Sequence, residues 1–204
     1  MTSSGITDKS NTDCLIKELA TMGCTISATV GNNGVKELPG YLSKREIEVV
    51  QMTWAIVSTD MMGTGLYMFQ RLFEIQKDLQ KLFKKLLLPS ETASYFFDEV
   101  KLQSHAMIVM QGLGAAVESL DDSVYLTNIL LTMGERHSRY NVQPEMIALL
   151  WPAIRDALKE KLKDDFTTEA ELAWRHVFDY ISSNMAEGIR NGQKTANGGK
   201  AIKS

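Results

Sequence analysis

Residues 101–120 read KLQSHAMIVMQGLGAAVESL, and they give the clearest indication of the class of fold. Apolar residues in this stretch recur at steps of three and four, which is the period of an α-helix with one buried face. The pattern predicts a long helix from about Tyr95 to Leu120, with an imidazole on its buried side. One stripe of that face carries Leu102, His105, Val109, Gly112 and Ala116.

A second histidine occupies a comparable position 32 residues further along the chain. Met133 and His137 share one face of a predicted helix that begins at about Val124, and Met133 lies one turn before His137. Val109 likewise follows His105 by one turn. Both imidazoles are therefore expected to point into apolar surroundings.

The same helical period continues on both sides of these two segments. Ser43 and Glu46 form the sequence pattern of a capping box, and Thr168 with Glu171 repeats it. Pro152 predicts a kink or a helix boundary, since proline removes a helical hydrogen bond. No segment has the alternation of a strand, so we expect an all-α fold of six to eight helices. The further helices are expected at about residues 43–57, 60–76, 144–163 and 168–189.

Length and charge set the outline of the protein. The chain of 204 residues carries a formal net charge of −3, and residues 188–204 hold four basic residues and no acidic one. A mildly acidic body does not favour nucleic-acid binding. The longest apolar run, residues 147–154, is too short to cross a bilayer. We expect a flexible N-terminal arm (residues 1–42), a folded domain (43–190) and a flexible basic tail (191–204).

On the residues alone, the two inward-facing histidines allow two interpretations. A buried histidine is most often a hydrogen-bonded core residue, but two that face each other from adjoining helices can also hold a metal. Zinc needs three or four ligands at short spacing, and the sequence has no HExxH or CxxC motif. Haem iron needs only one or two axial imidazoles and an apolar cleft, which Phe69 and Phe83 could line. The third histidine, His176, is expected on the surface or in a contact between helices.

From Ser43 to about Gly188 the chain resembles the globin family, and within it the neuroglobin and globin X groups. Phe83 follows Trp54 by 29 residues and precedes His105 by 22, the same intervals as in neuroglobin. The interval of 32 residues between the two histidines also agrees. The resemblance is carried by Trp54, Phe69, Leu82, Phe83, His105, Val109, Met133, His137, Val142 and Trp174.

The resemblance implies a globin fold around a pocket for haem b (iron protoporphyrin IX). His137 would be the proximal iron ligand, with its other ring nitrogen donating to a backbone carbonyl or a neighbouring side chain, and Phe83 would wedge against the macrocycle. His105 would be the distal residue, with Val109 beside it, and would itself ligate the iron when no gas is bound. The cofactor-binding residues implied are Phe69, Phe83, His105, Val109, Met133, His137 and Val142, with His137 and His105 as the metal ligands.

A globin of this kind is expected to bind oxygen, NO or CO reversibly, in a redox, sensing or oxygen-supply role. It would be primarily a ligand-binding and oxygen-carrier protein. One alternative is enzymatic: reduction of nitrite or dioxygenation of nitric oxide, which would need an external and unidentified reductase. Another alternative is a haem-free scaffold of the same fold, in which both histidines are ordinary core residues.

The N-terminal arm contains both cysteines, Cys14 and Cys24, so a disulfide-stapled fold is not expected and a reducing, cytoplasmic setting is. Residues 22–27 match the N-myristoylation pattern, with Cys24 available for palmitoylation, and globin X proteins are similar in beginning with Met-Gly-Cys and being acylated there. Acylation needs Gly23 at the N-terminus, whereas this chain begins at Met1. Attachment to the inner face of the plasma membrane is therefore expected only if translation starts at Met22.

Overall fold

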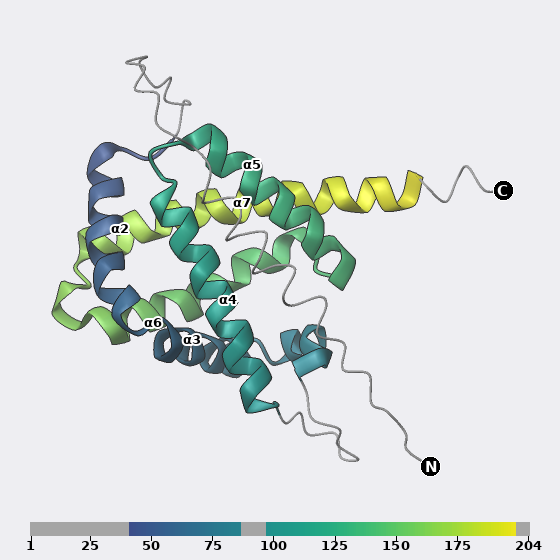
Figure 1. Ribbon diagram of the computed structural model, residues 1–204, viewed down its shortest axis with the longest axis horizontal. Helices are drawn as coiled ribbons and strands as arrows, with labels where there is room; N and C mark the ends of the chain where they lie inside the picture. The colour runs from purple at the N-terminus through teal and green to yellow at the C-terminus, as the bar shows by residue number, and fades with distance from the viewer. Residues whose placement is uncertain (1–40, 87–96, 199–204) are drawn as a thin grey trace, which may run out of the picture. The chain divides into compact units, whose positions relative to one another are not determined.

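The computed structural model describes residues 41–86 and 97–198. Within these ranges the chain forms six α-helices and five short 3₁₀ helices, with no β-strand, so the expected all-α class is confirmed (Figure 1). The elements are α2 (Lys44–Val57), η1 (Ser58–Asp60), α3 (Met61–Ile75), η2 (Lys77–Leu86), α4 (Glu99–Glu118), α5 (Ser123–His137), η3 (Ser138–Tyr140), η4 (Pro144–Leu150), α6 (Trp151–Leu162), η5 (Lys163–Asp165) and α7 (Thr168–Gly198).

Helix α2 begins with the predicted capping box. The Glu46 N–H donates to the Ser43 hydroxyl at 3.3 Å, and the Glu46 carboxylate accepts from the Ser43 N–H at 2.8 Å. Two amide groups that a helix start would leave without partners are thereby satisfied. The apolar face that follows, with Ile47, Val50 and Val57, is buried in the core.

Two tryptophans join α2 to α7 at the centre of the core. The rings of Trp54 and Trp174 lie 6.2 Å apart between centroids. The indole N–H of Trp174 donates to the hydroxyl of Thr53 at 2.9 Å. The Thr53 hydroxyl in turn donates to the carbonyl oxygen of Val49 at 2.8 Å. Throughout the described part of the chain, no buried side-chain nitrogen or oxygen lacks a hydrogen-bond partner.

A close crossing of α3 and α4 fixes how these two helices meet. A Cβ built on Gly65 would lie 2.8 Å from the Met110 Cγ and 3.2 Å from the Ala106 carbonyl oxygen, so only glycine fits without displacement. Phe69 lies one turn after Gly65, and His105 directly precedes Ala106. The crossing therefore brings Phe69 and His105 to the same side of the interface.

Two predicted helix boundaries are corrected by the structure. The helix expected over residues 144–163 is divided into η4 and α6. Pro152 lies in the first turn of α6, where a backbone N–H has no partner within the helix, so proline costs no helical hydrogen bond. The cap of the last helix is Thr167 and not Thr168, because the Thr167 hydroxyl accepts from the Ala170 N–H at 3.2 Å. Two consecutive threonines give no sequence signal for which of their hydroxyls caps the helix.

The long helix with the first histidine begins at Glu99 rather than near Tyr95. Asp98 is its N-cap, and the Asp98 carboxylate accepts from the Lys101 N–H at 3.2 Å. The Asp98 N–H in turn donates to the Leu86 carbonyl at 2.7 Å, which ties the start of α4 to the end of η2.

The ends of the folded region differ from the expected boundaries at 42 and 190. Tyr41 and Leu42 pack on the core, since the Tyr41 hydroxyl donates to the Leu120 carbonyl at 2.6 Å and Leu42 is buried. Helix α7 continues to Gly198, well past residue 190, and α5 packs mainly along it (Figure 1). Residues 1–40 of the predicted arm (1–42), with Gly23 and both cysteines, lie outside the described residues. Among the described helices, none combines the length and apolar character needed to cross a bilayer.

Candidate functional site

His137 is the last residue of α5, and its imidazole is held by its own helix. The Nδ1 atom lies 2.7 Å from the carbonyl oxygen of Met133, one turn earlier. A carbonyl can only accept, so Nδ1 carries the hydrogen and Nε2 keeps its lone pair. The expected backbone partner for this imidazole is confirmed, and Nε2 is the atom that can ligate a metal.

His105 lies on α4 between two phenylalanine rings. Its ring centroid is 5.2 Å from that of Phe69 and 5.6 Å from that of Phe83. Burial, with the neighbouring His137 as a smaller cause, lowers the pKa of His105 to about 4. His105 is therefore a neutral imidazole at pH 7, with one ring nitrogen able to donate a lone pair.

His137 lies near enough to His105 to contribute to the lowering of its pKa. Helices α4 and α5 also approach each other between them: a Cβ built on Gly112 would lie 3.7 Å from the methyl carbon of Met133, an ordinary van der Waals contact. The predicted pair thus lies on two helices that contact each other at Gly112 and Met133.

The cluster of aromatic rings beside His105 is larger than the sequence predicts. Phe69 and Phe83 contact each other edge to face at 5.8 Å, as expected for two residues lining one cleft. Phe73 joins them at 5.2 Å from Phe83, and Phe97 stacks on Phe73 at 4.4 Å. Phe73 could have been predicted as a member of this cluster, because it lies one turn after Phe69 on the same helix face. Nothing in the sequence indicated Phe97.

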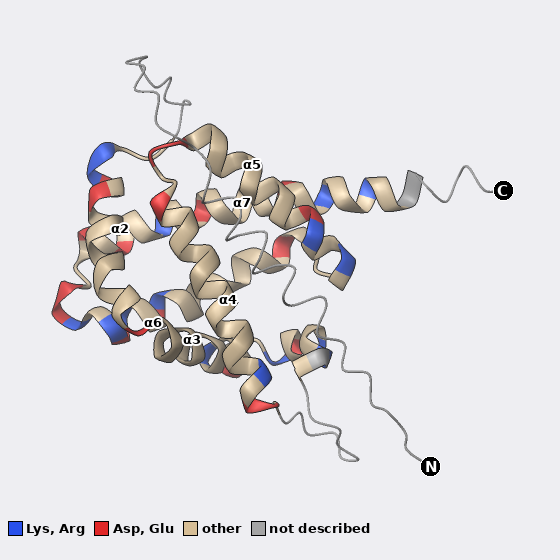
Figure 2. Ribbon diagram, viewed as in Figure 1, with Lys and Arg blue, Asp and Glu red and all other residues tan. Residues whose placement is uncertain are grey.

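The remaining candidate residues are apolar and half-buried. Val109, Met133 and Val142 all pack against the core, and Val109 lies one turn after His105. The helices around the histidines also lack charge over long stretches. There is no Lys, Arg, Asp or Glu between Lys101 and Glu118 on α4, and this stretch appears as an unbroken tan ribbon in Figure 2.

This donor set fits some metal groups and not others. Within the described ranges, no three His, Cys, Asp or Glu side chains gather closely enough to hold a bare metal ion, so they form no zinc site. Two imidazoles on different helices, beside aromatic side chains, instead suit a flat macrocycle that brings four donors of its own and needs only one or two further ligands. The residues present therefore fit haem.

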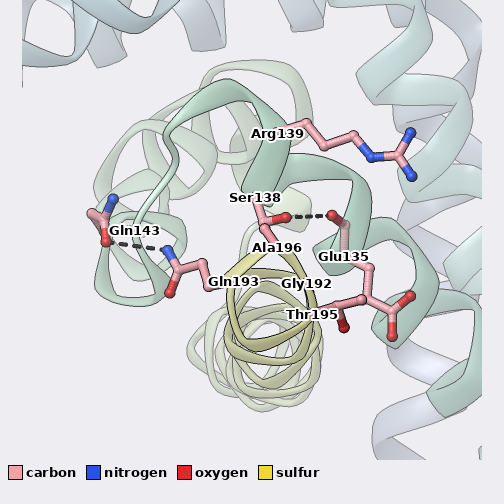
Figure 3. Close-up of a pocket in the computed structure, with 8 residues that line it drawn as sticks. All are labelled: Glu135, Ser138, Arg139, Gln143, Gly192, Gln193, Thr195 and Ala196. Carbon is pink, nitrogen blue, oxygen red and sulfur yellow. Dashed lines mark hydrogen bonds between the residues drawn. The ribbon is translucent and has the colours of Figure 1, made fainter. Parts of the chain in front are cut away.

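A separate polar groove of about 600 Å³ lies between the end of α5, η3 and the last turns of α7 (Figure 3). None of the seven candidate residues, all of which are described, lines it. The Gln193 amide donates to the Gln143 side-chain oxygen at 3.3 Å across its wall. Its lining consists of Glu135, Ser138, Arg139, Gln143, Gly192, Gln193, Thr195 and Ala196.

The third histidine lies on the surface, as predicted. The side chain of His176 is 57% exposed, and its Nδ1 pairs with the carboxylate of Glu46 on α2. It thus connects α7 to the start of α2 and has no part in the site.

Comparisons with known proteins agree with this geometry. The family model described as Globin matches residues 66–185. Neuroglobins of Tetraodon nigroviridis and Danio rerio are each 27% identical to the chain, over 156 and 157 residues, covering 76% of this chain and 98% of theirs. A crystal structure of a hexacoordinated heme protein from an anhydrobiotic tardigrade, at pH 4, superposes with a TM-score of 0.67 at 20% identity. That alignment covers 76% of this chain and 99% of the other, and it shows a shared fold.

Proposed function

This chain belongs to the globin family, and we propose that it binds haem between α4 and α5, with His137 as the permanent axial ligand. The observation that carries the proposal is the hydrogen bond from His137 Nδ1 to the Met133 carbonyl. It fixes the tautomer and the ring orientation, and it makes Nε2 more basic, which is how proximal ligands are held in metal sites. The two neuroglobins support the same assignment by sequence.

When bound, haem supplies an iron with two axial positions, one for a permanent imidazole and one for an imidazole or a diatomic gas. His105 is proposed as the second ligand in the absence of gas. Its burial beside Phe69 and Phe83 and its low pKa keep it neutral, so no proton has to leave before it can coordinate. The tardigrade protein that shares this fold is described as a hexacoordinated heme protein.

The proposed ligands are oxygen, NO and CO. If His105 holds the iron when no gas is bound, a gas would bind only to the molecules in which His105 is detached, and the apparent affinity would be reduced to that fraction of its intrinsic value. Such an arrangement suits sensing or redox exchange as well as oxygen supply. The cofactor is proposed to be haem b, held without covalent bonds, because the sequence has no CxxCH attachment motif.

The experiment is an absorption spectrum of the full chain, expressed with added haem and then reduced. We expect a Soret band and the spectrum of a six-coordinate, low-spin iron. His105→Leu should convert the ferrous protein to five-coordinate and high-spin, while His137→Ala should lose haem. His176→Ala is the matched control, since this histidine lies on the surface, and it should behave like the unchanged protein.

Two results would count against the proposal. A chain that folds but takes up no haem would favour the haem-free scaffold. A five-coordinate ferrous spectrum in the unchanged protein would remove His105 as a ligand and leave His137 in place.

Membrane attachment through residues 22–27 is a separate proposal, supported only by the acylation pattern. A chain starting at Met22 would expose Gly23 for myristoylation, with Cys24 available for a second acyl group, and two chains give stable anchoring. Mass spectrometry of the native N-terminus tests it. Molecules that all begin at Met1, without an acyl group, would end the idea.

A further inference from the structure

We infer that Gly188 and Gly192 of α7 are positioning residues for His137, a role that rests on the proposed haem binding. Gly192 belongs to the predicted tail (residues 191–204), and both glycines lie beyond residue 185, where the family match ends. The matched region therefore does not account for the contacts they make. These contacts lie against the last turns of α5, the helix that carries His137.

The first contact is a reciprocal one between the backbones of two glycines. A Cβ built on Gly134 of α5 would lie 2.9 Å from the Gly188 Cα and would overlap the Met185 carbonyl. A Cβ built on Gly188 would lie 3.0 Å from the Gly134 Cα and would overlap the Leu131 carbonyl. Each helix thus presses its Cα against a main-chain carbonyl of the other, as in glycine-mediated helix crossings.

The second contact lies one turn further along α7. A Cβ built on Gly192 would lie 2.9 Å from the Glu135 carbonyl oxygen and would overlap the Ser138 hydroxyl. That hydroxyl donates to the same carbonyl at 2.7 Å (Figure 3). Gly192 therefore packs against the hydrogen bond that closes the C-terminal turn of α5, and Ser138 is the residue next to His137.

These contacts act on His137 because they involve the main chain. The groups touched belong to residues 131, 134, 135 and 138, which surround the last turn of α5 on the side of α7. A main-chain contact cannot be relieved by a change of rotamer, so a new Cβ must move the helix itself. The Met133 carbonyl and His137 move with that turn, and the position of Nε2 moves with them.

The test uses the full-length, haem-loaded chain with His105→Leu as the background, because the bond between iron and His137 is then visible in the ferrous state. Gly192→Ala and Gly188→Ala are added separately. We expect each to shift the iron–histidine stretching band in resonance Raman spectra and to speed haem transfer to an acceptor apoprotein about tenfold, as loss of a supporting contact does in metal sites. Gly192→Ala keeps the test valid if Gly188→Ala does not fold: the Ser138 hydroxyl can rotate away from the new Cβ, while the approach of 2.9 Å to the Glu135 carbonyl oxygen still displaces the turn.

Gly114→Ala in the same background is the matched control. Its Cβ would lie 2.9 Å from a ring carbon of Trp54, so it overpacks a helix crossing against α2, although less tightly than the two α7 variants overpack α5. It should lower stability and leave the stretching band in place. A rescue adds a second readout: Ser138→Ala removes the hydroxyl that the new Cβ meets, so Gly192→Ala with Ser138→Ala should recover part of the shift.

The outcomes separate the two proposals. If the background variant holds no haem, the proposed function fails, and the inference fails with it. If the background shows a normal iron–histidine band that both α7 variants leave unchanged, haem binding stands and the positioning role is overturned. An equal shift in the Gly114→Ala control would also overturn it, because the effect would then be one of general destabilisation.

Discussion

Gly65 of α3 lies against the main chain of Ala106 in α4, so that a Cβ on Gly65 would come within 3.2 Å of the Ala106 carbonyl oxygen. The same Cβ would lie 2.8 Å from the Cγ of Met110, a side chain flexible enough to move. We expect Gly65→Ala to lower the free energy of unfolding by about 1 kcal/mol, because the carbonyl has no such freedom. Urea unfolding followed by circular dichroism measures it.

Gly112→Ala provides the comparison for this prediction. Its Cβ would meet only the methyl carbon of Met133, at 3.7 Å, which is ordinary contact. Alanine in the middle of a helix is favoured over glycine, so this variant should gain about 0.5 kcal/mol. Equal and destabilising effects at the two glycines would show that the α3–α4 crossing is less tight than described.

The buried hydrogen bond between Thr53 and Trp174 makes a second prediction. Thr53→Val keeps the shape of the side chain but leaves the Trp174 indole N–H without its acceptor. An unpaired buried donor costs about 2 kcal/mol, and the unfolding free energy should fall by that amount.

A double-mutant cycle checks the cause of that loss. Trp174→Phe removes the indole N–H, so Thr53→Val should cost clearly less in the Trp174→Phe background than in the unchanged protein. Additive effects would mean that the hydrogen bond contributes nothing beyond the packing of the two side chains.

The helical spacing of apolar residues made the helices and the positions of the two site histidines predictable. His105 and His137 could be placed on facing apolar stripes because periodicity reports which face of a helix is buried. The backbone partner of His137 followed from the chemistry of proximal ligands, which the resemblance supplied. The capping box of Ser43 and Glu46 was predictable because it is formed by residues three apart.

Contacts between residues far apart in sequence could not be predicted in the same way. Gly134 and Gly188 meet through their main chains, and a glycine inside a helix looks the same in sequence whether it faces solvent or a second helix. Gly192 instead falls in the predicted tail of residues 191–204, in line with the low helix propensity of glycine. Packing on α5 overrides that propensity and carries α7 on to Gly198.

The capping box also predicts a dependence of stability on acid. Hydrogen bonds from the Ser43 hydroxyl hold the pKa of Glu46 below its ordinary value of 4.5, with further help from the Ser43 N–H and from His176. The folded chain then binds this proton more weakly than the unfolded chain, so the contribution is complete above about pH 4.5 and is lost as the pH falls through the lowered pKa. The advantage of the unchanged protein over Glu46→Gln should shrink between pH 6 and pH 3, measured by urea unfolding at about equal ionic strength.

Ser43→Ala tests the same box at neutral pH. Loss of the cap should cost about 1 kcal/mol. If the gap between the unchanged protein and Glu46→Gln stays constant with pH, the carboxylate is not responsible for the acid sensitivity.

Tyr41 predicts a loss of stability at the opposite end of the pH range. Burial, with the nearby charges of Tyr180, Asp121 and Asp122, raises the pKa of Tyr41 from 10.0 to about 12. The folded chain therefore holds this proton more tightly than the unfolded chain, and the contribution is complete below pH 10 and lost between pH 10 and about 12.

Tyr41→Phe isolates this contribution from the other groups that titrate in alkali. At pH 8 the variant should be less stable by about 1 kcal/mol, because it lacks the hydrogen bond to the Leu120 carbonyl. As the pH rises from 10 towards 12, the ionised hydroxyl of the unfolded chain removes that advantage, and the two unfolding curves should converge. Curves that stay parallel across this range would show that Tyr41 is not held by the core, and that the folded region begins after it.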